Sequence, residues 1–399
     1  MKKPRVLIVS AVVPAINGGG GRLALHRHFT QREDVICAVV SRFADQSSCK
    51  DTYTLKENRL VKRLKRSAIS RVVNNLELLT APLWTNGAAM KWIKDWKPDL
   101  VFTVADDWHS QAARKIASRL GIPLVVDFQD IFCLSNFTQL PKKPYGILRP
   151  LLVRRFRALQ RNARAVFHTS QGMKDWFGVE KRGEVLYPIG EQIQVEALSG
   201  TAPREKPLIV YAGNCYGPYG EMLLRLSHAV KKSGKIGLRI FTMGNDWPED
   251  LLEEFSNLGI YKGYRPFAEL HEELLAADGF LTAMSFKEVD RTFVSTSFTT
   301  KWLDYAPFAK PIFVWAPEYS SAAEFSRRTN AGIVVSDPDP DRLIETILET
   351  RKDPGKWVEA RESAKDAAEN DLNSERIHAV LLRTLDQVLN QQDSIRDAG

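Results

Sequence analysis

The most concentrated chemistry in the chain lies in a hydroxyl-rich stretch, residues 294–305. Five of the six residues from Ser295 to Thr300 carry a hydroxyl, and an apolar, helix-compatible run follows them. The first N–H groups of a helix have no partner inside it, and the helix dipole is positive there. Thr299, Thr300 and Lys301 would therefore present amides, hydroxyls and one ammonium to an anion such as a pyrophosphate.

Asp304 lies four residues after Thr300, about one turn along the same helical face. A carboxylate there can accept two hydrogen bonds from a vicinal diol such as a ribose. Phosphate at the helix tip and sugar hydroxyls one turn away is the layout of a nucleotide. The pattern equally fits a structural role, in which Ser and Thr cap the helix and Asp304 complements its dipole. The local pattern leaves both interpretations open.

Four glycines stand in the segment 17–22, between the first predicted strand and the first predicted helix. Without side chains, Gly19, Gly20 and Gly21 would let a phosphate or sugar approach the backbone closely. The spacing Gly19-x-Gly21-x-x-Ala24 fits a relaxed dinucleotide fingerprint. However, the glycines begin eight residues after the strand, and no acidic residue ends the second strand. The alternatives are a loop that contacts a bound anion and a flexible loop without a ligand.

Two polar segments, 106–109 and 127–130, each follow a predicted strand. Residues at these ends line the crevice of an open α/β sheet. His109 beside carboxylates suits proton transfer, and Asp130 is a second candidate of the same kind. An Asp at such a place also commonly caps the following helix, so a structural role is the alternative.

Short Val-rich runs bounded by Pro, Gly or Asp alternate with helix-like stretches throughout the chain, which predicts buried parallel strands in doubly wound α/β domains. In the first half the predicted strands are 6–10, 35–40, 100–104, 124–128 and 165–169, and the helices are 22–30, 87–96, 111–120, 149–161 and 173–177. In the second half the strands are 208–212, 238–243, 279–281, 312–315 and 332–335, with helices beginning at Glu221, Glu249, Ala268, Thr300, Ala322 and Asp341.

Residues 191–207 have no periodicity and contain two prolines and a glycine, which predicts an interdomain linker. We therefore expect two Rossmann-like domains, 1–195 and 207–374, facing across a cleft. Residues 375–392 form a long amphipathic pattern with no strand after it, and this helix is expected to pack back on the first domain.

Charge differs sharply between the two halves. Residues 1–200 hold 32 Lys and Arg against 17 Asp and Glu, whereas residues 201–399 hold 24 against 31. The basic half would favour an anionic acceptor or an anionic membrane surface. Nucleic acid is not expected, because no recognisable binding motif accompanies the basic residues. No apolar stretch reaches the roughly 18 residues of a membrane span, and four scattered cysteines without a CxxC pair suit a reducing cytoplasm.

Two basic stretches with apolar residues at helical spacing, 55–73 and 149–157, could lie on a membrane surface. In the first, Leu60, Leu64 and Ala68 follow one another at i, i+4 spacing among lysines and arginines. A solvated helix face over the domain's own core explains either stretch equally well. Both interpretations remain open.

Taken together, the motifs resemble the family 4 retaining glycosyltransferases, which have the two-domain GT-B fold. The most specific match runs from Tyr261 through the Glu269-Leu270 pair to Asp278. It is similar to a family segment that binds the nucleotide base through backbone, here near Tyr264 and Arg265. The resemblance assigns ribose to Asp304, pyrophosphate to Phe298, Thr299, Thr300 and Lys301, donor-sugar hydroxyls to Thr296 beside Ser297, the donor phosphate to Gly19, Gly20 and Gly21, and a donor-domain turn to Gly213 and Asn214.

Three positions depart from that pattern. The family usually has an Arg and a Lys just after Gly213, whereas the segment here contains no cation. Lys301, Arg291 or Lys287 would have to neutralise the diphosphate. The family's first-domain His is replaced by Gln129, next to the matching Asp130, and Thr296 stands where a carboxylate contacts the donor sugar.

The resemblance implies a cytoplasmic hexosyltransferase that moves a sugar from a nucleoside diphosphate, UDP in the first instance, to a glycan or lipid-linked acceptor in polysaccharide biosynthesis. It implies retention of configuration, and neither a cofactor nor a metal, because no DxD-type carboxylate pair lies where the diphosphate would sit. Peripheral attachment to the inner membrane is a further expectation. The alternatives are a GT-B-fold sugar-nucleotide epimerase and a non-catalytic protein that binds sugar nucleotides.

Overall fold

The computed structural model describes residues 3–17, 20–57, 59–80, 86–106, 108–131, 149–178, 183–190 and 204–397. The chain forms two compact units. The N-terminal unit comprises residues 1–189 together with 377–399, and the C-terminal unit comprises residues 190–376. The boundary near residue 190 lies at the start of the predicted linker, most of which is outside the described residues.

A seven-stranded parallel sheet forms the centre of the N-terminal unit. Its inner strands are buried and mainly apolar, as expected for a sheet covered on both faces, with Thr103 in β4 and Asp127 in β5 as buried polar residues. Its strands, in spatial order, are β3 (Asp51–Thr54), β2 (Ile36–Ser41), β1 (Arg5–Val9), β4 (Leu100–Val104), β5 (Leu124–Phe128), β6 (Ala165–His168) and β7 (Glu184–Val185).

Helices cover this sheet through two separate apolar clusters. One cluster joins the sheet to residues such as Ile93, Ile116 and Phe156 of the helices α4, α5 and α6. The other joins it to Phe29 of α1 and to Leu381 of the C-terminal helix α16. The bounds are α1 (Gly20–Phe29), α2 (Arg59–Leu64), α3 (Ser70–Thr80), α4 (Gly87–Trp96), α5 (Trp108–Leu120), α6 (Arg149–Asn162), α7 (Gln171–Trp176), α16 (Ser374–Asp397) and the 3-10 turn η1 (Ala44–Gln46).

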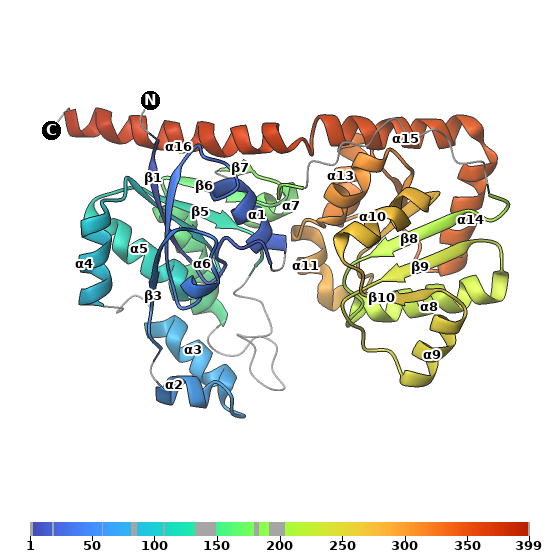
Figure 1. Cartoon of the computed structure of the whole chain (residues 1–399), viewed down its shortest axis with the longest axis horizontal. Coiled ribbons are helices and arrows are strands. Elements are labelled where there is room, and N and C mark those ends of the chain that lie inside the picture. The colour runs from blue at the N-terminus through green and yellow to red at the C-terminus, as the bar shows by residue number, and fades with distance from the viewer. Residues whose placement is uncertain are drawn as a thin grey trace. The chain divides into compact units, whose positions relative to one another are not determined.

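The last helix, α16, returns to the unit that contains the first strand, so both chain ends lie there (Figure 1). Its apolar face includes Leu381 and Leu385, both completely buried in the cluster around Phe29 and Phe102. A buried polar contact adds to this packing, because His378 lies 3.1 Å from His28 through their Nδ1 atoms. The tail helix is therefore part of the N-terminal unit's core.

The C-terminal unit has a six-stranded parallel sheet of the same kind. Its strands, in spatial order, are β10 (Tyr261–Gly263), β9 (Gly237–Phe241), β8 (Leu208–Ala212), β11 (Gly279–Ala283), β12 (Ile312–Trp315) and β13 (Ile333–Val335). Its helices are α8 (Pro218–Ser233), α9 (Glu249–Asn257), α10 (Phe267–Ala276), α11 (Arg291–Thr296), α12 (Lys301–Tyr305), α13 (Ser321–Thr329), α14 (Pro340–Lys352) and α15 (Pro354–Glu369), with 3-10 turns η5 (Glu288–Asp290) and η6 (Ala306–Phe308).

In both sheets the strand order reverses beside the first strand of the unit, between β1 and β4 and between β8 and β11. Loops that leave two neighbouring strands in opposite directions open a crevice at their carboxyl ends, where ligands of open α/β sheets bind. The predicted class, two doubly wound α/β domains, is confirmed. We call these two places the switch points.

Several local elements differ from the prediction, including the helices α11 and α15, which were not predicted. The unpredicted strands β3, β7 and β10 all lie at sheet edges, where partial exposure weakens the apolar pattern. The helix predicted from Thr300 is only five residues long, and the stretch 297–300 separates it from α11. A 3-10 turn containing Pro307 follows α12 immediately, because proline cannot continue the hydrogen-bonding pattern of a helix.

Candidate functional site

The switch point of the C-terminal unit is built around the turn after β8. Tyr211, completely buried, donates its hydroxyl hydrogen to the Asn214 carbonyl at 2.6 Å. The hydroxyl of Tyr305, on α12, accepts a hydrogen bond from the Ala212 amide at 2.7 Å. These bonds fix the turn at Gly213 and attach α12 to the carboxyl end of β8.

Lys301, the first residue of α12, extends across this turn. Its Nζ lies 4.8 Å from the centre of the Tyr211 ring and 5.8 Å from that of Tyr219. A Cβ at Gly213 would come within 2.8 Å of the same nitrogen, so glycine leaves the space that the lysine occupies. Burial lowers the pKa of Lys301 to about 8, an effect that the charge of Asp304 opposes.

No hydrogen-bond acceptor or carboxylate pairs with the Lys301 ammonium within the described part of the chain. The other two proposed substitutes for the missing cations are engaged. Lys287 binds Glu221, whereas Arg291 pairs with Glu288 at 3.3 Å and lies over the Tyr319 ring. Of these three cations, Lys301 is the one available to an anionic ligand.

The hydroxyl-rich stretch divides between two short helices. Thr296 ends α11, is buried, and donates its hydroxyl to the Thr292 carbonyl at 2.7 Å. Ser297 is also buried, and its carbonyl accepts the hydroxyl of Ser321. Thr299 lies 3.4 Å from Thr282 of β11 through their hydroxyls, at the switch point itself. The predicted donor residues therefore differ in access to ligand.

The start of α12 departs from the predicted phosphate-binding helix. Thr300, its N-cap residue, makes no side-chain capping bond. A five-residue helix also sums few peptide dipoles, so its amides alone give little anion binding. Phe298 packs edge-on against Phe325, with ring centres 5.4 Å apart, while Asp304 is partly buried one turn after Thr300. At this switch point the positive charge available to an anion therefore comes from the ammonium of Lys301.

Large exposed side chains follow the neighbouring strands β8, β9 and β10. Met243 is 87% exposed, Tyr264 is 59% exposed and Tyr216 is 50% exposed. Arg265, beside Tyr264, pairs with Glu269 at 3.6 Å. Asn214 accepts the Tyr216 amide at 3.1 Å, so this asparagine shapes its own loop. Apolar, solvent-facing groups at this edge provide a surface on which a planar base could stack.

The switch point of the N-terminal unit is organised by a carboxylate. Asp106, after β4, accepts hydrogen bonds from the Ser10 hydroxyl and from the Ala11 and Val12 amides, each at 3.1 Å. The loop after β1 is thereby fixed to the end of β4. Sequence reasoning had noted this Asp only as part of a polar segment, without a role.

Asp127 and Gln129 form a second polar pair, at the end of β5. The Gln129 amide donates to Asp127 at 2.9 Å, while the other Asp127 oxygen is buried without a hydrogen-bond partner. Burial raises the pKa of Asp127 to about 7, and the bond from Gln129 opposes this shift. A Cβ at Gly21 would come within 2.2 Å of Gln129, so the glycine admits this side chain. Sequence reasoning noted Asp127 only as part of a polar segment, because its burial is a tertiary property.

The remaining candidates of this unit fall in different environments. Gly20 begins α1, whereas Gly19 lies outside the described residues. Asp130 is exposed just beyond β5. His109 is completely buried, stacks on Trp108 with ring centres 4.0 Å apart, and accepts the Arg42 amide at 3.3 Å. The structure thus brings Gly21 to Gln129, and it places His109 next to Arg42.

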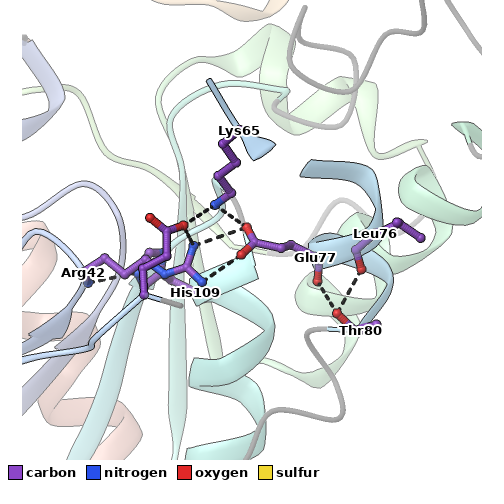
Figure 2. Close-up of polar contacts among 7 residues, drawn as sticks. Arg42, Lys65, Leu76, Glu77, Thr80 and His109 are labelled. Carbon is purple, nitrogen blue, oxygen red and sulfur yellow. Dashed lines mark hydrogen bonds and ion pairs between the residues drawn. The ribbon is translucent and has the colours of Figure 1, made fainter. Parts of the chain in front are cut away.

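Figure 2 shows a charged cluster that sequence reasoning did not identify. Arg42 binds Glu77 at 2.8 Å and Glu57 at 2.9 Å, and Lys65 contacts the same two carboxylates. The Arg42 guanidinium also lies 4.3 Å from the centre of the Trp108 ring. The cluster fastens α2 and α3 to the carboxyl end of β2 and the start of α5.

Comparison with known proteins supports this architecture. A search of curated proteins finds no match. A glycosyltransferase from Rickettsia africae has a TM-score of 0.64 at 12% identity over 98% of this chain and 99% of its own. Anabaena Alr3699/HepE, solved with UDP-glucose, has a TM-score of 0.60 at 14% identity over 97% and 100%. A UDP-GlcNAc 2-epimerase from Neisseria meningitidis has a TM-score of 0.54 at 12% identity over 96% and 100%.

The fold is therefore that of the GT-B proteins, with two parallel-sheet α/β domains. More particularly, residues 57–186 match the model of the glycosyl transferase 4-like domain. Over these residues the predicted resemblance to family 4 glycosyltransferases is confirmed. No helix in the described ranges has the length and apolar character needed to cross a bilayer.

Proposed function

We propose that this protein is a retaining glycosyltransferase that transfers a hexose from UDP-hexose to a glycan or lipid-linked acceptor. The observation that carries the proposal is the ammonium of Lys301, which lies beside the Gly213 turn with no acceptor of its own in the described chain. A leaving nucleoside diphosphate needs its growing charge stabilised, and a fixed cation in a partly buried site does so effectively.

The rest of the donor would extend from this cation along the same edge. Asp304 would hold the ribose hydroxyls, and the exposed side chains near Tyr264 and Met243 would lie against the base. Thr299, which lies at the switch point, would contact the diphosphate or the sugar. UDP is the proposed nucleotide, since Anabaena Alr3699/HepE was solved with UDP-glucose.

The proposed reaction needs no proton-transfer residue at the acceptor. The acceptor hydroxyl attacks on the face that the diphosphate leaves, and a departing phosphate oxygen takes the hydroxyl proton. The anomeric configuration is then retained. This scheme accommodates Gln129 in place of the family's His. Metal independence is part of the proposal, and a rate unchanged by a chelator such as EDTA would support it.

The binding step is tested by calorimetry with UDP. We expect Lys301→Met to weaken UDP binding by about 2–3 kcal/mol, the scale for a hydrogen bond to a charged group. Lys287→Met is the matched control, because it removes the same charge from a lysine already paired with Glu221. Equal losses in both variants would refute the role given to Lys301.

The catalytic step is tested with UDP-hexoses and acceptor extracts, and NMR reports the anomeric configuration of the product. A new epimer from UDP-sugar alone would favour an epimerase, a reaction also found among proteins of this fold. UDP binding without turnover on any acceptor would instead favour a non-catalytic binding protein.

For the acceptor side, we propose a cytoplasmic protein that attaches peripherally to an anionic membrane through α2 and α3. Leu60 and Leu76 are more than half exposed, and Ile69 and Val72 are nearly so. Exposed Arg59, Lys62, Arg63 and Arg66 surround them. Apolar groups among cations are the pattern of an interfacial helix.

The cluster around Arg42 sharpens the membrane test. Lys65 holds Glu57 and Glu77, so reversing its charge would disturb the fold rather than the surface. Lys62→Glu with Arg63→Glu should lower cosedimentation with phosphatidylglycerol vesicles, whereas Lys232→Glu with Lys235→Glu, on the C-terminal unit, should not. Unchanged cosedimentation in the first pair would remove the membrane proposal and leave the transferase proposal intact.

A further inference from the structure

A basic cavity of about 820 Å³ lies in the N-terminal unit at the amino ends of β5 and β6. The C-terminal half of α5, the start of β5 and the end of α6 surround it. The start of β6 is held close by a bond from the Arg164 amide to the Leu124 carbonyl at 2.7 Å. The lining includes five cations and no carboxylate: Arg114, Lys115, Arg119, Arg161 and Arg164.

Neither bordering helix supplies a counter-charge, because the sequences of α5 and α6 contain no Asp or Glu. Within the described ranges, Arg114, Lys115, Arg119 and Arg164 form no ion pair. The Arg114 Nε is moreover buried without a hydrogen-bond partner. Desolvation and then repulsion by Arg119 lower the pKa of Lys115. Four of the five cations have thus been gathered without an ion pair in the described part of the chain.

A structural explanation covers only part of this set. Cations in the last turn of a helix are stabilised by its dipole, which accounts for Arg119 and Arg161. It does not account for Arg114, in the middle of α5, or for Arg164, which lies beyond α6. Grouped cations that face a shared hollow are the arrangement that binds phosphate groups.

The position separates this cavity from the proposed reaction. Parallel strands have their carboxyl ends at one edge of the sheet, and this cavity lies at the opposite edge. Asp106 and Gln129 lie at the carboxyl edge of the same sheet. A ligand of the basic cavity therefore cannot be the group that reacts at the switch point.

We propose that the basic cavity binds a ligand carrying two or more phosphate charges, at a site distinct from the donor site. Its volume exceeds that of one phosphate, and the four cations without an ion pair in the described chain call for more than a single negative charge. A phosphorylated lipid headgroup and a free polyphosphate share this chemistry. The proposal does not depend on the protein's being a glycosyltransferase.

The test uses the full chain with inorganic pyrophosphate as the probe, and calorimetry with saturating UDP keeps the donor site occupied. Arg114→Gln, Arg119→Gln and Arg164→Gln together should weaken pyrophosphate binding about tenfold or more, equivalent to at least 1.4 kcal/mol. The matched control is Lys232→Gln, Lys235→Gln and Lys352→Gln, which removes three exposed charges from the C-terminal unit. The control should bind as the wild type does.

A second arm identifies the source of the phosphate. Vesicles of phosphatidic acid, whose headgroup phosphate carries up to two charges, are the probe. If cosedimentation of the wild type with them depends on these three arginines and pyrophosphate competes with it, the ligand is a lipid headgroup. Pyrophosphate binding without such cosedimentation indicates a free polyphosphate. If the triple variant fails to fold, the exposed pair Arg119→Gln and Arg164→Gln replaces it and should show a smaller loss. Equal pyrophosphate affinity in folded variant and wild type, or no binding in either arm, would overturn the proposal.

Discussion

The two switch points have the same topology and opposite charge. In the N-terminal unit the Asp106 carboxylate is bound by amides of its own chain, and Asp127 is buried with a raised pKa. In the C-terminal unit the Lys301 ammonium lies near two tyrosine rings and pairs with no described acceptor. The fold thus supplies the place for a ligand, while the side chains decide which unit can hold an anion.

Of the substitutions that test this difference between the two switch points, the one at Asp106 is expected to have the largest effect, a loss of stability. Asp106→Ala removes three hydrogen bonds to one charged oxygen, and we expect the free energy of unfolding to fall by roughly 2–4 kcal/mol. UDP affinity should not change, because the proposed donor site lies in the C-terminal unit. Denaturant titration measures the first quantity and calorimetry the second. Asp45→Ala, an exposed position, is the control. Weaker UDP binding in Asp106→Ala would contradict the division of roles between the units.

Asp304 tests the donor side of the same comparison. Asp304→Ala should weaken UDP binding by about 1–3 kcal/mol, since the ribose hydroxyls would lose a charged acceptor. Deoxyuridine diphosphate, which lacks one of those hydroxyls, should be affected less. Glu359→Ala on α15 serves as the control of equal charge. If UDP affinity is the same in Asp304→Ala and wild type, the ribose assignment is wrong.

The pH dependence of UDP binding should report Lys301. Its pKa in the free protein is about 8, and a bound diphosphate favours the charged form. Affinity should therefore be steady below pH 8 and fall as pH rises above it, by at most about tenfold per unit. Calorimetry between pH 7 and 9 measures this, and Lys301→Met should abolish the dependence. A wild-type profile that is flat over the same range would contradict it.

Asp127 provides a further test in the N-terminal unit, because its pKa in the folded state is about 7. Between the ordinary Asp value near 4 and this value, the folded state holds a proton that the unfolded state lacks. Stability should therefore fall as pH rises from about 4 to 7, by about 1 kcal/mol per unit from this group. Asp127→Asn should reduce that slope and can still accept the bond from Gln129. Identical slopes in denaturant titrations would show that Asp127 is ionised.

The strands and helices could be predicted from the sequence better than the environments of the site residues could. Runs such as 100–104 and 208–212 identify strands because parallel strands buried on both faces have to be continuously apolar. The edge strand β10 escaped prediction because it is only partly buried. The short helix α11 also escaped prediction, whereas the start of α12 near Thr300 and its end before Pro307 were predicted to within a residue or two.

The candidate site likewise has residues that could be proposed from local sequence and environments that could not. Lys301 and Asp304 could be proposed from their spacing, and Gly21 from its small size. The environment of Lys301, between Tyr211 and Tyr219, joins residues about ninety positions apart. Burial, which sets the pKa of Asp127 and Lys301, likewise arises only when distant segments meet. Such tertiary effects leave no local pattern in a single sequence.

The place of α16 affects how the protein can be divided and when it folds. Residues 1–189 alone would leave the apolar surface around Phe29 and Phe102 uncovered, because Leu381 and Leu385 normally seal it. An autonomous version of that half must include the final 23 residues. During synthesis, residues 1–189 leave the ribosome well before residues 377–399, so the core of this unit cannot close until α16 has emerged.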